Sequence, residues 1–242
     1  MNRIELIQQV FKNTNFEYYL EIGCRKGRSF LPIVAKHKIV VDPSFAIPIL
    51  RKLRWIYLVP ENTNNQYFEE ESDTFFEKRK NLIKQLDVVL VDGLHTFRNS
   101  LNDVLNSLKY LNENGIIILH DCLPPNKAAA TPTKLFPTKK ERKAIDGWTN
   151  QWCGDVYKSI IYLSAKYPNA LNSCVVNTDY GLGIVRPKAD ISNLNLSIDE
   201  ALFSKIDKIT YDDLIKNPKG VIDLQDAEYL EAVIRQMKDL PE

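Results

Sequence analysis

The fold of this chain is decided by the stretch Tyr18-Tyr19-Leu20-Glu21-Ile22-Gly23-Cys24-Arg25-Lys26-Gly27-Arg28-Ser29-Phe30. Its pattern predicts a buried strand, then a glycine turn, then the start of a helix. Fifteen residues past Gly27, a second apolar run ends in Asp42. In doubly wound α/β sheets, a glycine loop after the first strand and an acid after the second hold an adenosine cofactor. The stretch therefore predicts such a sheet and a cofactor site at its carboxyl edge.

The rest of the chain repeats this alternation of strands and helices. Strands are expected at 18–22, 38–42, 87–92 and 116–119, a closing hairpin around 177–181, and a strand at 55–59 by composition alone. Helices are expected at 3–13, 45–54, 72–84, 97–112 and 154–167, with Ser72 as a cap. We predict an α/β fold with a doubly wound, mostly parallel seven-stranded sheet, Rossmann-like, with an antiparallel closing strand.

Two segments fall outside this alternation. Residues 124–143 hold four prolines and six basic residues against one acid, so we expect a long loop over 124–150. Either it is a solvated, mobile surface, or it is a lid that closes over an acidic or phosphorylated acceptor. Residues 191–242 carry two weaker helical patterns. The expected domains are thus 1–190, which binds the cofactor, and a helical C-terminal appendage at 191–242.

Net charge, the length of apolar runs and cysteine spacing limit the kinds of partner that the chain is expected to bind. The formal net charge of +1 gives no case for nucleic acid, and no run is long enough to span a membrane, so neither partner is expected. The four cysteines lie far apart with no Cys-x-x-Cys pair, which argues against a disulfide frame or a zinc site and favours the cytoplasm. The expected partner is a small-molecule acceptor, acidic or glycosylated, and the oligomeric state stays open.

Acids and histidines follow two neighbouring strands of the predicted sheet. Asp92 and His95 follow the fourth strand, and His120-Asp121 follows the fifth. Because the carboxyl ends of parallel strands line one crevice, we expect these side chains to converge there. Histidine titrates near neutrality and can take a proton from a hydroxyl, so the cluster predicts general-base chemistry.

The spacing Glu-x-Gly-x-x-x-Gly differs from the glycine patterns of dinucleotide enzymes and of Walker phosphate loops. It resembles the first motif of class I S-adenosylmethionine-dependent methyltransferases. By that resemblance, S-adenosyl-L-methionine is the cofactor. Its expected contacts are Glu21, Gly23, Gly27, Ser29, Asp42, Asp73 and Asp92. Of these, Glu21 is an acid in an apolar strand, which is costly unless it meets a donor or a cation.

The pattern Asp92-x-x-His95, then His120-Asp121, resembles metal-dependent sugar O-methyltransferases, including those that act on macrolide sugars. They belong to the methyltransferase family often numbered twenty-four, which also shows a segment similar to Gly154-Asp155-Val156-Tyr157-Lys158. The resemblance implies that Asp92 and Asp121 hold Mg²⁺ or another divalent cation and that His95 is the base. Some relatives have glutamate in place of His120, so this histidine could bind a softer ion or orient the substrate.

The expected function is methyl transfer to the hydroxyl of a sugar-like or other small acceptor, with Asp92, His95 and His120 in catalytic roles. The alternative is a non-catalytic cofactor-fold domain whose basic loop engages a partner. Convergence of Asp92, His95 and Asp121 in the folded chain favours the enzyme.

Overall fold

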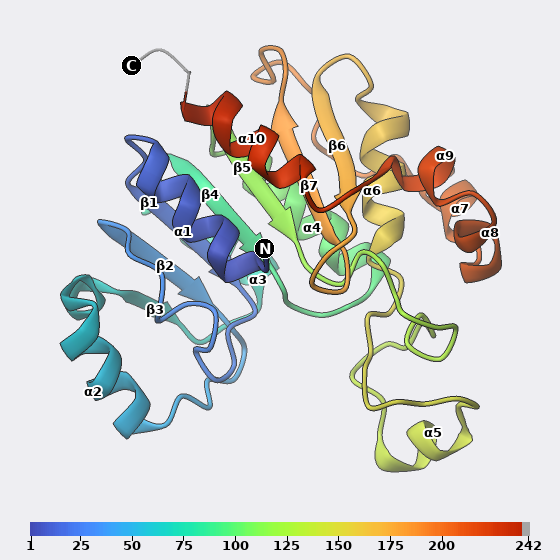
Figure 1. Ribbon diagram of the computed structural model, residues 1–242, viewed down its shortest axis with the longest axis horizontal. Coiled ribbons are helices and arrows are strands. Elements are labelled where there is room, and N and C mark those ends of the chain that lie inside the picture. Colours follow the sequence, from blue (N-terminus) through green and yellow to red (C-terminus); the bar gives the residue numbers. More distant parts are fainter. Residues whose placement is uncertain (239–242) are drawn as a thin grey trace.

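The computed structural model of the chain describes residues 1–238, which form one eight-stranded sheet with helices on both faces (Figure 1). The strand order is β3-β2-β1-β4-β5-β7-β6-β8, and only β7 runs antiparallel to its neighbours. The predicted mostly parallel sheet with an antiparallel closing strand is therefore confirmed. The strands are β1 (Tyr18–Ile22), β2 (His37–Val41), β3 (Gln66–Phe68), β4 (Leu86–Val91), β5 (Leu111–Leu119), β6 (Leu171–Val176), β7 (Leu182–Pro187) and β8 (Leu224–Gln225).

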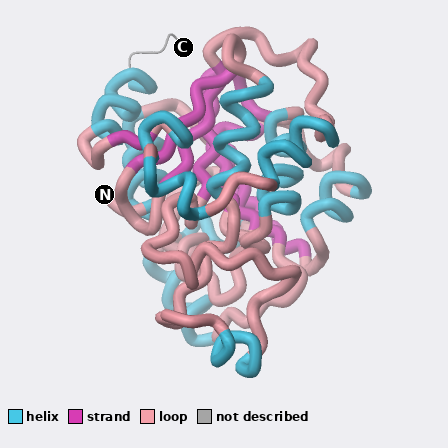
Figure 2. The backbone as a smooth tube through the Cα atoms, turned by 90° about the vertical axis from the view of Figure 1, so that its right-hand side faces the viewer, coloured by secondary structure: helices cyan, strands magenta, loops and turns pink. Residues whose placement is uncertain are grey.

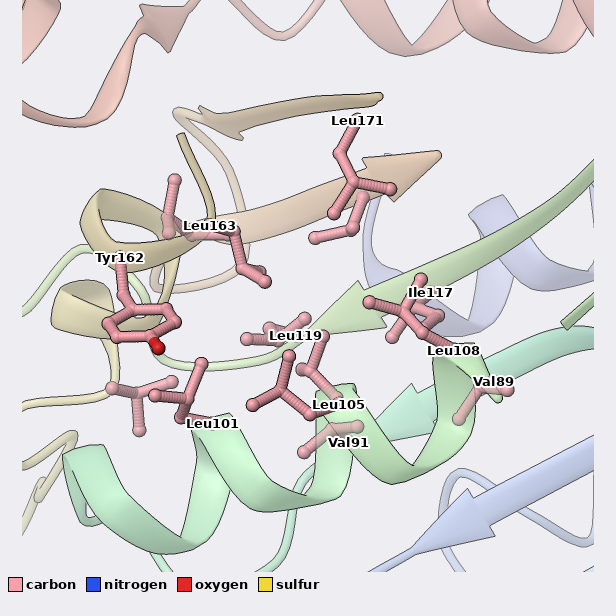
Figure 3. Packing of buried hydrophobic residues seen from close by; sticks show 14 of the residues in the cluster. Val89, Val91, Leu101, Leu105, Leu108, Ile117, Leu119, Tyr162, Leu163 and Leu171 are labelled. Carbon is pink, nitrogen blue, oxygen red and sulfur yellow. The ribbon is translucent and has the colours of Figure 1, made fainter. Parts of the chain in front are cut away.

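Two helical layers bury the faces of the sheet. Helices α1 (Arg3–Asn13) and α10 (Tyr229–Lys238) lie together on one face, and α4 (Phe97–Leu108) and α6 (Tyr157–Lys166) lie on the other (Figure 1). Strand residues alternate between two apolar clusters, so Leu20 and Ile22 pack with α4 and α6 while Tyr19 packs with α1. Figure 3 shows the cluster between α4, α6 and the central strands. Each large apolar side chain buried there contributes about 1.5–3 kcal/mol.

The helices that lead into the candidate site have clear start signals. Asn2 caps α1 by accepting from the backbone N–H groups of Ile4 and Glu5, and Glu5 returns the bond in a capping box. Thr96 caps α4 by accepting from the N–H of Asn99. These caps fix the ends of α1 and α4 at the carboxyl edge of the sheet.

Four sequence expectations are wrong in detail. The helix expected over 97–112 ends at Leu108, and strand β5 already begins at Leu111. Residues 25–32 form turns, and the described segment between β1 and β2 contains no helix, in part because Pro32 lacks the N–H that a helix would need there. Residues 55–58 lie in helix α2 (Ile49–Leu58) rather than in a strand, since no breaker separates them from the helix formers after Pro48. Helix α3 (Ser72–Lys78) is shorter than expected, and Glu71 rather than Ser72 occupies its cap position.

The C-terminal segment is continuous with the rest of the molecule. Helices α7 (Glu200–Asp207), α8 (Tyr211–Lys216) and α9 (Pro218–Ile222) lie beside α6 and share its apolar cluster. Strand β8 then extends the sheet beyond the seven strands expected, because a two-residue strand carries no periodic signal. The last residues of the expected appendage, 239–242, lie outside the described part of the chain.

The loop over 124–150 stands at one end of the molecule. It contains one short helix, α5 (Lys139–Ala144), which lies at the bottom of Figure 2. A 3-10 turn, η1 (Pro60–Asn64), joins α2 to β3. Across residues 1–238, no helix has both the length and the apolar character needed to cross a bilayer.

Candidate functional site

The polar residues that follow β4 and β5 meet at the carboxyl edge of the sheet. The two strands pair in parallel up to Val91 and Leu119, so the residues after them emerge side by side. Nδ1 of His120 lies 3.2 Å from Oδ1 of Asp92 and 3.0 Å from Oδ2 of Asp121. Nδ1 of His95 lies 3.3 Å from Oδ2 of Asp121, and Nε2 of His95 lies 3.6 Å from Oδ1 of Asp92. All four predicted residues therefore form one cluster.

His95 is held by the segment that precedes α6. Its Nδ1 lies 2.6 Å from the carbonyl oxygen of Trp152, and the two rings stack with centroids 5.2 Å apart. Gly154 has φ +57°, and a Cβ there would lie 1.8 Å from the carbonyl oxygen of His95, so only glycine allows this approach. The carboxylate of Asp155 accepts from the N–H of Phe97, the first residue of α4.

Tyr157 and Lys158 of the same segment are buried. Nζ of Lys158 lies 3.2 Å from Oδ2 of Asp155 and 3.1 Å from Oδ1 of Asp207 on α7. The Gly-Asp-Val-Tyr-Lys segment thus forms a scaffold behind His95 and ties it to the C-terminal helices.

The contact with Trp152 fixes the proton of His95. A carbonyl oxygen only accepts, so Nδ1 must carry hydrogen, and Nε2 is left with the lone pair when the ring is neutral. Burial lowers the pKa of His95, but Asp92 and Asp121 outweigh it and hold the pKa above its usual value. Nε2 of His95 is thus the one ring atom that can accept a proton or bind a cation.

The sequence analysis missed two residues of this cluster, Arg3 and Asp179. Nη1 of Arg3 lies 2.8 Å from Oδ2 of Asp179 and 2.9 Å from Nε2 of His120, and Nε of Arg3 lies 3.5 Å from Oδ2 of Asp92. Arg3 begins α1, and Asp179 lies in the β6–β7 turn, where Asp179, Tyr180 and Gly181 all have positive φ. No motif in the sequence marks these two residues, since only the fold brings residues 3 and 179 to the crevice.

Charges in the cluster offset one another. Burial opposes ionisation of Asp92, but His120, His95 and Arg3 outweigh it and hold the pKa of Asp92 well below its usual range. Burial also lowers the pKa of His120, yet Asp121, Asp179 and Asp92 raise it to about 11. Three carboxylates thus face one guanidinium and two imidazoles, which makes the cluster close to neutral when both rings are protonated.

The same residues fit a divalent cation. Asp92, His95 and Asp121 each offer a ligand atom, and these atoms lie within 4.8 Å of one another. Nε2 of His120 faces the donor Nη1 of Arg3, so Nδ1 of His120 carries hydrogen and lies against the carboxylates of Asp92 and Asp121. Magnesium prefers oxygen ligands, whereas a mixture of imidazole and carboxylate suits manganese, iron or zinc. The donor set therefore fits a softer ion better than Mg²⁺.

The two glycines of the loop after β1 have different surroundings. A Cβ on Gly23 would lie 2.1 Å from the carbonyl oxygen of Asp92, so Gly23 permits close packing of the β1 and β4 ends. A Cβ on Gly27 would meet only the flexible side chains of Leu31 and Ile47, at 3.0 Å or more. Both have positive φ, at +86° and +67°.

Glu21 and Ser29 bond to each other beneath this loop. Oε1 of Glu21 accepts from the hydroxyl of Ser29, and Oε2 accepts from the hydroxyl of Tyr19, both at 2.6 Å. Burial raises the pKa of Glu21 to about 7, although these two hydrogen bonds oppose the rise. The donors that a buried acid needs are supplied here from within the chain.

Asp42 joins the end of β2 to the glycine loop. Its Oδ2 accepts from the N–H groups of Cys24 and Arg25, and its Oδ1 accepts from the N–H of Ser44. A carboxylate has about four acceptor positions, so one remains on Oδ1. Asp42 therefore keeps one acceptor position that a ligand donor could use.

Asp73 lies apart from the cluster described above. It is an exposed residue in the first turn of α3 and lines a small cavity of about 240 Å³ with Asn106 and Lys109. Another cavity, of about 820 Å³, lies at the opposite edge of the sheet, where residues 187–192 meet the end of α4. None of the predicted site residues lines that cavity.

Comparison with known proteins gives the fold a name. Residues 20–122 match a family model described as a methyltransferase domain, the model numbered twenty-four. Among curated proteins, no sequence matches the chain.

Solved structures agree on the architecture. A protein from Klebsiella pneumoniae assigned as an O-methyltransferase is 14% identical, covers 77% of this chain and 79% of its own, and gives a TM-score of 0.53. Cofactor-bound Rv0187 from MTB is 9% identical, covers 78% and 82%, and gives a TM-score of 0.56. The chain therefore has the fold of the class I methyltransferases, and its residues 20–122 match their methyltransferase domain.

Proposed function

We propose that this protein is an S-adenosylmethionine-dependent O-methyltransferase that acts on a sugar-like or other small hydroxyl acceptor. The observation that carries the proposal is the convergence of Asp92, His95, His120 and Asp121 at the carboxyl ends of β4 and β5. A protein that only bound the cofactor would have no need of this cluster. Its place at the end of β4, against the glycine loop, is where a bound cofactor would present its methyl group.

The chemistry assigned to these residues is simple. The methyl group of a sulfonium is already activated, so the enzyme has to align an in-line attack and remove the proton of the acceptor. Alignment is worth up to about 7–11 kcal/mol in ideal cases. Nε2 of His95 accepts the proton, because Nδ1 is committed to Trp152. Its raised pKa means that this role strengthens as the pH rises above the ordinary value for histidine.

The cofactor lies across the glycine loop in this proposal. Asp42 offers its remaining acceptor position to a ribose hydroxyl, while Gly23 and Gly27 keep the loop in place. Glu21 and Ser29 support the loop from below and do not need to touch the ligand. Asp73 is proposed for the adenine end, although it stands in the first turn of α3, away from the cluster.

A divalent cation would be held by Asp92 and Asp121, and His95 is the imidazole within reach of the same position. When bound, it would lower the pKa of an acceptor hydroxyl. His95 has a single available nitrogen, so it cannot both ligate the ion and accept a proton. With His95 as base, the ion would be held by the carboxylates of Asp92 and Asp121, and His120, which carries hydrogen at Nδ1, would orient the acceptor.

The surroundings of the site complete the proposal. We assign the catalytic domain to residues 1–190, with 124–150 as its lid, and place the enzyme in the cytoplasm. The four cysteines are free and buried, which fits a reducing compartment.

An acceptor screen that measures released S-adenosylhomocysteine tests the proposal. Wild type should turn over at least one hydroxyl acceptor, and His95→Ala should lower kcat by roughly 10²–10⁴-fold with nearly unchanged cofactor affinity. His37→Ala is the matched control, since His37 is an exposed residue stacked on Tyr18. Cofactor binding without turnover on any acceptor would favour a non-catalytic binding domain.

A further inference from the structure

Helix α2 turns its apolar side chains toward solvent. Five of these residues have exposed fractions between 50% and 85%, and the helix contains no buried residue. They are Ile49, Leu50, Leu53, Tyr57 and Leu58. A helix that packs on a core shows the reverse order, with the apolar face inward. In α2, Trp55 is the residue that packs against the apolar cluster of the sheet.

Positive charge flanks this apolar face. Helix α2 carries Arg51, Lys52 and Arg54 and has no acid. On a helical wheel, Arg54 and Arg51 lie on one side of the apolar arc from Ile49 to Leu50, whereas Lys52, on the other side, is half-buried with its Nζ over the ring of Tyr67. The distribution matches that of amphipathic helices that lie in a membrane interface.

The glycine loop continues the same surface. Arg25, Lys26 and Arg28 are exposed, and Nη1 of Arg51 donates to the carbonyl oxygen of Lys26 at 2.9 Å. Residues 22–60 contain eight Lys and Arg against one acid, the buried Asp42, and six of these cations belong to α2 and the glycine loop, since Lys38 is buried and Lys36 pairs with Glu17. The net charge of the whole chain is only +1, so positive charge is concentrated here. We call this region, the exposed residues of α2 with Arg25, Lys26 and Arg28, the α2 surface.

We propose that the α2 surface docks the protein on an anionic lipid bilayer. A bilayer interface receives aliphatic side chains and attracts Lys and Arg at the same time. A second copy of the chain fits less well, because a two-fold contact would bring the same cations together. A nucleic acid would use the cations but leave Ile49, Leu50 and Leu53 without partners, since bases stack on aromatic rings.

This inference goes beyond the proposed function and does not depend on methyl transfer. It also differs from the expectation that no membrane partner exists, because that expectation rested on the lack of a spanning segment. Figure 1 shows α2 at the lower left, projecting beyond β3, so nothing in the described chain covers its outer face.

Sedimentation with lipid vesicles tests the proposal. The probes are vesicles of phosphatidylcholine containing about one-third phosphatidylglycerol, and vesicles of phosphatidylcholine alone. Wild type should bind the anionic vesicles, and added salt should release it. Leu53→Glu should weaken binding more than about tenfold, and Arg54→Gln about fivefold. Ile215→Glu is the matched control, because Ile215 is a similarly exposed apolar residue on α8.

Each variant changes an exposed side chain, and thermal melting checks that the fold is retained. Binding that Leu53→Glu removes and Ile215→Glu leaves intact supports the proposal. No binding to anionic vesicles, or equal binding by Leu53→Glu and wild type, overturns it. A dimer that Leu53→Glu converts to a monomer, or RNA binding in place of vesicle binding, would assign the α2 surface to another partner and equally overturn it.

Discussion

Asp103 is a buried carboxyl whose ionisation should set the pH dependence of stability. It lies on α4 behind the turn that carries His95, and its Oδ2 would be 3.5 Å from a Cβ placed on Gly93. Its Oδ1 has no hydrogen-bond partner. Burial raises the pKa of Asp103 from 3.8 to about 7, although a hydrogen bond from Ser72 opposes the rise. The perturbation we choose is Asp103→Asn, which keeps the shape and removes the charge.

The size of the effect follows from that shift. A carboxyl with a raised folded pKa favours folding in its protonated form, so its contribution is complete below pH 3.8 and is lost as the pH rises through about 7. A difference of about three pKa units corresponds to on the order of 4 kcal/mol. The asparagine variant has no proton to lose at this site. Its stability relative to wild type should therefore increase by about 2.5 kcal/mol between pH 5 and pH 8, because the remainder of the loss already occurs between pH 3.8 and pH 5.

Urea unfolding at several pH values between 5 and 8 measures this difference. Asp146→Asn serves as the control, because Asp146 is exposed and its loss should change the free energy of unfolding by less than about 0.5 kcal/mol at every pH. A constant difference between Asp103→Asn and wild type across this range would refute the argument. It would mean that Asp103 stays ionised in the folded protein.

Three further predictions concern the site and its scaffold. Gly23→Ala should lower the free energy of unfolding by more than about 2 kcal/mol, because the new Cβ would lie 2.1 Å from backbone. Gly27→Ala should lower it by about 1–2 kcal/mol, because its positive φ is unfavourable for alanine. Equal losses in the two variants would contradict this reasoning. Lys158→Met should lower stability by about 3 kcal/mol in thermal or urea melts, since it leaves the buried Asp155 without its cation, and an unchanged melt would count against the scaffold role. Chelation by EDTA should suppress S-adenosylhomocysteine release, and Mn²⁺ should restore it better than Mg²⁺; full turnover in chelator would remove the metal from the proposal.

Much of the fold follows from local patterns in the chain. The apolar runs at β1, β2, β4 and β5 are short and bounded by polar residues, which is typical of buried parallel strands. The order of strands and helices then implies the doubly wound sheet. The pattern fails where two structures compete for similar residues. Trp55 and Ile56 suit a strand by composition, but the helix that starts after Pro48 continues through them.

The site was partly predictable for a related reason. Asp92, His95, His120 and Asp121 directly follow strands, so topology alone brings them together. Arg3 and Asp179 come from the start of a helix and from a hairpin turn, and only the packing of α1 beside the sheet brings them to the same crevice. The detailed bonding was not predictable either. The carboxylate of Asp42 accepts three hydrogen bonds from backbone N–H groups of neighbouring residues, and no sequence pattern predicts these bonds.

Binding of S-adenosylhomocysteine, measured by titration calorimetry, tests the central claim most directly. The account predicts saturable binding at one site per chain. Asp42→Asn should weaken it, because this variant disturbs both the loop contacts and the remaining acceptor position. Asp146→Asn should bind as wild type does, since Asp146 is exposed in the loop over 124–150. A folded wild-type protein that gives no saturable heat with this ligand would contradict the assignment of the carboxyl edge as a methyltransferase site.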